Sequence, residues 1–164
     1  MSNFNELCKF NAQVEQARQE ARSLIRREAV RLVTFYEKWL GLPAPHWVDE
    51  HGKHAYVEVG ELKNGEFTAC APQAIPVDDD CALTMAVKTA VGSDSDTPVI
   101  SVTLRLKLVS AGDAGVDVAV EINNDNPIQV FTTATDEHAY NDVASSMKKH
   151  IMKVLQKRYP QPYL

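Results

Sequence analysis

Residues 99–122, VISVTLRLKLVSAGDAGVDVAVEI, carry the clearest secondary-structure pattern in the chain. Apolar side chains occupy every second position on both sides of a glycine-containing turn, which is the period of a β-strand with one buried face. Residues 99–110 and 116–123 are therefore predicted to pair as an antiparallel hairpin. The intervening positions are mostly polar or charged, so we expect the opposite face of this sheet to be in contact with water.

Four further segments continue the same pattern on either side of this hairpin. The first two flank Asn64-Gly65, a dipeptide that favours a tight hairpin turn because both of its positions need a positive φ. The sequence thus predicts a six-stranded, meander-like antiparallel sheet within residues 55–134, whereas the Pro-containing stretch 42–54 is expected to be a loop. The four additional strands are predicted at 55–62, 66–71, 82–91 and 128–134.

Amphipathic helices are predicted at both ends of the chain. In residues 1–41 the apolar side chains recur in steps of three and four, until Gly41 and Pro43 supply a stop signal. A second helix is predicted over 136–159, with Thr135 or Asp136 as its N-cap. The chain is therefore expected to be a single α+β domain, residues 1–164, with both helices on the apolar face of the sheet.

The first predicted helix is long for a domain of this size. It would measure about 55 Å, whereas a compact domain of 164 residues is only about 40 Å across. The helix must therefore bend, with a break near Ser23, or project from the domain. We favour projection, and expect a homodimer with this helix in the interface.

Charge divides the chain into the same three segments. Residues 1–41, 42–135 and 136–164 carry net charges of +2, −9 and +2. We therefore expect an acidic outer sheet face that binds another protein with a basic surface. The predicted binding residues are Glu58, Asp117, Glu121 and Phe131 on that face, with Arg18 and Arg22 on the first helix.

Catalytic motifs are not evident in the sequence. Glu28 interrupts the apolar stripe of the first helix, so it either pairs with an arginine or acts as an acid. The segment from His46 to His54 is rich in possible metal ligands, but their spacing matches no established metal motif. We therefore expect no catalytic residue, no metal and no cofactor.

Composition also bears on the expected compartment and on the expected partners. The three cysteines, Cys8, Cys70 and Cys81, are read as reduced thiols in a cytoplasmic protein. Since no run approaches the 18–20 or so apolar residues of a membrane span, no membrane contact is expected. The acidic middle segment disfavours nucleic acid as a partner, although the basic helices keep that alternative open.

The leading hypothesis from sequence is a non-enzymatic protein–protein interaction module, such as an adaptor, a secretion-type chaperone or an inhibitor. Two alternatives come from other classes. One is a carrier of a small apolar ligand, held between the sheet and the last helix. The other is an enzyme that uses Glu28 or the segment from His46 to His54.

Overall fold

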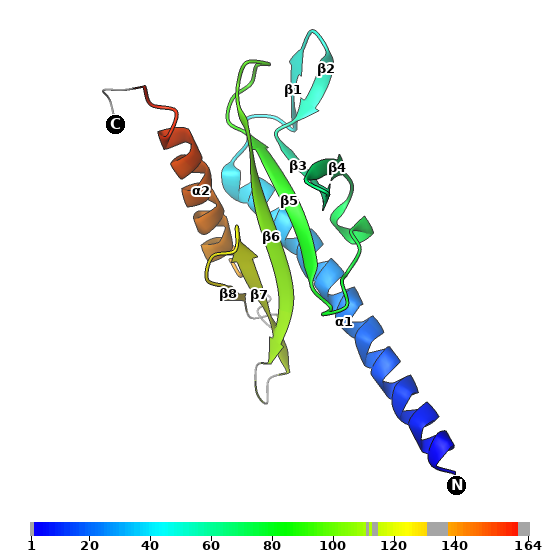
Figure 1. The fold of residues 1–164 in the computed structure, drawn as a ribbon. Helices are drawn as coiled ribbons and strands as arrows, with labels where there is room; N and C mark the ends of the chain where they lie inside the picture. The colour runs from blue at the N-terminus through cyan, green and yellow to red at the C-terminus, as the bar shows by residue number, and fades with distance from the viewer. Residues whose placement is uncertain (1, 111, 113–114, 131–137, 161–164) are drawn as a thin grey trace.

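A computed structural model describes residues 2–110, 112, 115–130 and 138–160. It contains a long helix α1 (Asn3–Leu40), a six-stranded antiparallel sheet and a second helix α2 (Asn141–Gln156) (Figure 1). The predicted α+β class, with an antiparallel sheet between two terminal helices, is confirmed.

The six strands lie in the order β4-β3-β5-β6-β7-β8, and every neighbouring pair is antiparallel. The predicted turn joins β3 to β4, and φ is positive at both Asn64 and Gly65. Strand β4 lies at the sheet edge, so the chain must cross β3 to reach β5. This crossover contains the short helix η1 (Pro72–Ala74), which packs against α1. The strands are β3 (Val57–Lys63), β4 (Glu66–Ala69), β5 (Leu83–Ala90), β6 (Val99–Ser110), β7 (Val116–Ile122) and β8 (Ile128–Val130).

One face of the sheet forms the core, and both helices cover it, as predicted. The register places Met85 opposite Leu104, and both side chains are fully buried. On the same face, the Tyr36 hydroxyl of α1 lies 2.7 Å from Thr89 Oγ1 of β5. Complete burial of an aliphatic side chain stabilises the fold by about 1.5–3 kcal/mol. These layers therefore supply most of the stability.

The segment expected to be a loop contains a small separate hairpin, so that prediction is wrong. Strands β1 (His46–Asp49) and β2 (Gly52–Ala55) pair with each other and not with the main sheet. Two contacts support the hairpin: the His51 N–H donates to Asp49 Oδ1 at 2.8 Å, and the Trp47 ring stacks on His54 with centroids 4.4 Å apart.

Helix α1 is continuous over 38 residues, about 57 Å, without the break considered near Ser23. The Ser2 side chain accepts a hydrogen bond from the Asn5 N–H, and Gly41 ends the helix in a left-handed conformation. The first buried residue is Ile25. The N-terminal part of α1 therefore extends well past the edge of the sheet (Figure 1).

The last helix begins later than predicted. Residues 138–140 form a turn, and α2 starts at Asn141. The N-cap candidates Thr135 and Asp136 lie outside the described residues, as does the end of the predicted strand 128–134. The turn matters for the site described below, because it carries His138 and Tyr140 to the surface of α1.

Candidate functional site

The projecting segment of α1, residues 3–17, is here named the arm. Every residue of the arm is exposed, including four large apolar side chains: Phe4 (72%), Leu7 (68%), Phe10 (65%) and Val14 (39%). Together they present roughly 450 Å² of apolar surface, taking about 150–200 Å² for each complete side chain. A patch of this size on a soluble protein commonly marks an interaction site.

The arm stripe has the spacing of a coiled-coil seam. Its residues alternate in steps of three and four, which corresponds to positions a and d of a heptad. They are Leu7, Phe10, Val14 and Ala17 of the arm, followed along α1 by Ala21 and Leu24. One helical turn after Ala21, Ile25 is already buried in the chain's own core. The seam of the arm thus continues directly into the side of α1 that the sheet covers.

The predicted acidic sheet face is only partly as expected. Glu58 is exposed and pairs in register with Lys88, while Glu121 is half-buried opposite Arg105. Asp117 was expected to face solvent, but it is 2% exposed. The Gln129 Nε2 donates a hydrogen bond to its Oδ2 at 2.9 Å. Phe131, the remaining predicted residue of this face, lies outside the described residues.

Turns hold most of the negative charge of the middle segment, so the outer strand positions are not strongly acidic. Those positions carry three carboxylates and three cations, which are Glu58, Asp117, Glu121, Lys88, Arg105 and Lys107. Arg105 also lies 3.4 Å from Asp78 and 3.6 Å from Asp80, two carboxylates of the turn before β5. The charge argument for an acidic outer face is accordingly weak.

The two predicted arginines of α1 lie at the base of the arm. Arg18 Nη2 donates to the Asp79 main-chain oxygen at 3.3 Å, which ties α1 to the same acidic turn. Arg22 is half-buried. These residues therefore mark the place where α1 leaves the body of the domain, and the structure does not bring them together with Glu58 or Glu121 into one site.

Glu28 is buried, at 1% exposure, and is surrounded by donors. The Tyr140 hydroxyl donates to its Oε2 at 2.6 Å. Arg31 Nη1 lies 3.4 Å from Oε2, and Arg27 Nη2 lies 3.5 Å from Oε1. Burial, together with the Glu28 carboxylate, raises the pKa of the Tyr140 phenol far above its usual range. Of the two hypotheses for Glu28, the structure therefore agrees with pairing to arginine.

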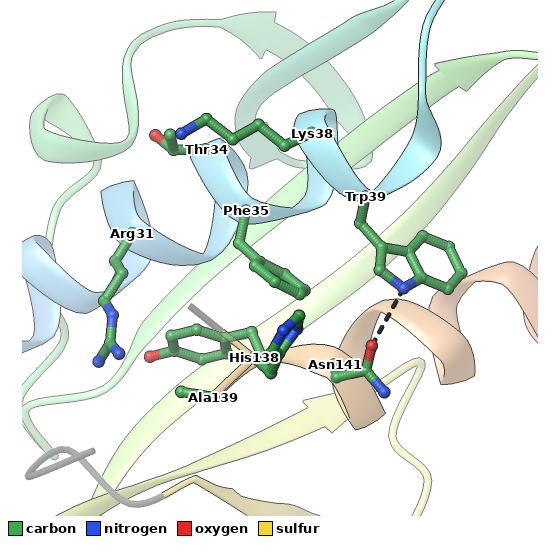
Figure 2. Close-up of a pocket in the computed structure, with 9 residues that line it drawn as sticks. Arg31, Thr34, Phe35, Lys38, Trp39, His138, Ala139 and Asn141 are labelled. Atoms are coloured by element: carbon green, nitrogen blue, oxygen red, sulfur yellow. Dashed lines mark hydrogen bonds between the residues drawn. The ribbon is translucent and has the colours of Figure 1, made fainter. Parts of the chain in front are cut away.

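A pocket of about 480 Å³ lies beside this cluster, between α1 and the turn that precedes α2 (Figure 2). We name it the helix-junction pocket. Phe35 points into it from α1, and the Trp39 Nε1 donates to Asn141 Oδ1 at 3.2 Å across one end. The described residues that line it are Arg31, Thr34, Phe35, Lys38, Trp39, His138, Ala139, Tyr140 and Asn141. Sequence reasoning missed this pocket, since its two sides are about a hundred residues apart in the chain.

The histidines of the segment from His46 to His54 do not converge. His46 and His51 are exposed, while the His54 Nε2 donates to Asp49 Oδ1 at 2.8 Å. Burial acts to raise the pKa of Asp49, but hydrogen bonds from His54 and the His51 N–H outweigh it and lower that pKa. Within the described residues, no cluster of three or more His, Cys, Asp or Glu side chains is arranged to hold a metal ion.

Comparisons with protein-family models, curated proteins and solved structures gave no match. The class that the structure itself defines is an α+β protein with a projecting N-terminal helix. In the part of the chain that the structure describes, neither helix has a stretch long and apolar enough to cross a membrane.

Proposed function

We propose that this protein is a non-enzymatic protein-interaction module that works as a homodimer, with the two arms paired antiparallel. The exposed apolar stripe of the arm carries this proposal. Phe10 alone exposes 65% of its surface, about 130 Å², and its burial would be worth about 3 kcal/mol. A symmetric dimer contains two such side chains. Removing both would weaken association by about 6 kcal/mol, or roughly 10⁴-fold.

A second copy fits the arm because the stripe complements itself. When two arms run antiparallel and are centred on residue 12, each position a faces a position d of the other chain. Leu7 then packs on Ala17 of the other copy, and Phe10 packs on Val14. Large side chains thus face smaller ones, which favours close packing.

The position of the domain body favours the antiparallel arrangement over a parallel one. Paired helices lie only about 8–10 Å apart. From Ile25 onward, the side of α1 that continues the seam is covered by the chain's own sheet. Two parallel helices would force both sheets into that narrow space. Antiparallel arms avoid this clash, since each body then lies at the opposite end of the pair.

Such a dimer holds two identical bodies apart with their outer sheet faces free, an arrangement that suits an adaptor or a chaperone. Binding of another protein by the outer sheet face stays a prediction. Its electrostatic support is weak, because the outer strand positions carry as many cations as carboxylates. Its test is a charge reversal at Glu58 and Glu121, since Asp117 is buried. The matched control reverses the charges of Arg18 and Arg22. If only this variant loses the partner, the partner binds at the base of the arm instead.

Sedimentation velocity at tens of micromolar tests the dimer. The wild-type chain should sediment as a dimer, and Leu7→Glu combined with Phe10→Glu should give a monomer of unchanged circular dichroism. Ala12→Glu combined with Gln19→Glu adds the same charge on the side of α1 opposite the apolar stripe, so this control should remain dimeric. A monomeric wild-type chain, or equal loss in both double variants, would remove the proposal.

A further inference from the structure

The helix-junction pocket is separate from the arm, and its chemistry points to a ligand independently of the dimer. Its volume of about 480 Å³ lies within the range of about 300–1,000 Å³ that is usual for small-molecule sites. Phe35 and Trp39 supply half-buried aromatic rings from α1. Tyr140 lines the other side from the turn, but only 1% of it is exposed. Aromatic walls of this kind favour a planar, apolar body that can stack.

The charge of the described lining is opposite in sign to the net charge of the whole chain. The protein carries a net charge of −5, yet the described lining contains Arg31 and Lys38 and no carboxylate. Glu28, which contacts the lining residues Arg31 and Tyr140, is held by these two side chains and by Arg27. A bound anion would therefore meet positive charge without a competing carboxylate from the described lining.

The position of α2 also favours an anion in the pocket. Asn141, the first residue of this helix, is part of the lining. The N-terminus of a helix carries a partial positive charge, which favours an anion close to it. In Figure 2, Arg31 and Asn141 lie at opposite ends of the pocket, with Phe35 and His138 between them. Apolar contact and positive charge are thus available to one ligand at the same time.

We propose that the helix-junction pocket binds a small aromatic acid, a planar apolar body that carries one anionic group. The rings of Phe35 and Trp39 contact the body of the ligand. Lys38 attracts the anionic group, and Arg31 supports that attraction while it holds Glu28 in place. The pocket would accordingly make this protein responsive to a metabolite, or a carrier of one.

The probe is 8-anilinonaphthalene-1-sulfonate, which joins aromatic rings to one anion. Its matched control is N-phenyl-1-naphthylamine, which has the same rings without the sulfonate. The proposal predicts saturable binding of one sulfonate per chain to the full-length protein. Lys38→Glu should weaken it by about tenfold, as expected for a reversed charge at close range, whereas Lys149→Glu, on α2 outside the pocket, should change it less than about twofold.

Three further measurements complete the test. The uncharged probe should bind the Lys38→Glu variant and the wild type within about twofold of each other, because it does not sense the charge. Ala139→Phe, which fills the pocket, should weaken both probes. Naphthalene-1-acetate should displace the sulfonate, and the matching amide should not.

Four outcomes would overturn the proposal. Equal sulfonate affinity in the Lys38→Glu and Lys149→Glu variants would show that the charge of the pocket is irrelevant. Unchanged affinity in the Ala139→Phe variant would place the probe elsewhere, and loss of binding in the Phe10→Glu variant would place it on the arm. Displacement by an acidic peptide alone would assign the pocket to a protein partner.

Discussion

Replacement of Tyr140 by phenylalanine probes the contact that joins α1 to the start of α2. The substitution removes one hydroxyl oxygen and keeps the ring, so the packing of Tyr140 against the core is preserved. Its hydroxyl lies 2.6 Å from Glu28 Oε2, and Glu28 is only 1% exposed. The variant would therefore leave a buried carboxylate with two arginine contacts of 3.4 and 3.5 Å.

The expected loss of stability follows from these distances. A hydrogen bond to a charged group contributes about 1.5–3 kcal/mol, and an unsatisfied buried acceptor is costly to desolvate. The arginine contacts are long, so they recover only part of this energy. Tyr140→Phe should thus lower the free energy of unfolding by about 2–3 kcal/mol.

Urea denaturation followed by circular dichroism measures the effect, with Tyr159→Phe as a matched control. Tyr159 is 58% exposed, so its hydroxyl should contribute less than about 0.5 kcal/mol. Glu28→Leu combined with Tyr140→Phe should cost less than the sum of the single changes, because neither buried partner is then left alone. A loss below about 0.5 kcal/mol for Tyr140→Phe would refute this account of the junction.

Three further predictions concern the body of the domain. Leu104→Ala should cost about 2–5 kcal/mol in urea denaturation through a cavity in the core, whereas Arg105→Ala should cost less than about 1 kcal/mol; the reverse order would mean that the strand faces are inverted. Burial raises the pKa of Tyr36 and Tyr140, so both phenols stay neutral in the fold and stability falls as the pH rises above about 10; ionisation of every phenol before unfolding, seen by ultraviolet absorbance, would contradict this. The pKa of Asp49 is lowered, so its ionised carboxylate stabilises the β1–β2 hairpin above about pH 4, and this stabilisation is lost as the pH falls further. Tryptophan emission should therefore change on acidification below about pH 4 in the wild type but not in Asp49→Asn.

The strands were predictable where local pattern and turn chemistry agree. The alternation of residues 99–110 corresponds to β6 with the same limits, and Asn64-Gly65 forms the predicted turn. The position of β4 at the edge was not predictable, because the crossover that follows it reads as a polar loop. Ile75 in that crossover is buried at 1% exposure. A single buried residue produces no hydrophobic periodicity, so its burial could not be predicted from the sequence.

Some features of the candidate functional site were likewise visible in the sequence, and others were not. The length of α1 was visible in the sequence, and in the structure this helix extends past the edge of the sheet (Figure 1). Burial of Asp117 was not visible, because alternation assigns a side chain to a face but cannot say whether a neighbour such as Gln129 covers it. Net charge was similarly misleading, since a total over a segment does not separate the strands from the turns.

A distance between two spin labels reports on the antiparallel pairing of the arms. Val30 is 37% exposed and lies beyond the arm, so Val30→Cys accepts a label when the native cysteines are replaced by serine. In the proposed register, the two labels lie 36 residues apart along the helix pair, or about 54 Å. Pulsed dipolar spectroscopy should therefore give a narrow distribution near 55 Å. A distance below about 35 Å would indicate parallel helices, and the absence of a dipolar signal would show that the arms do not pair.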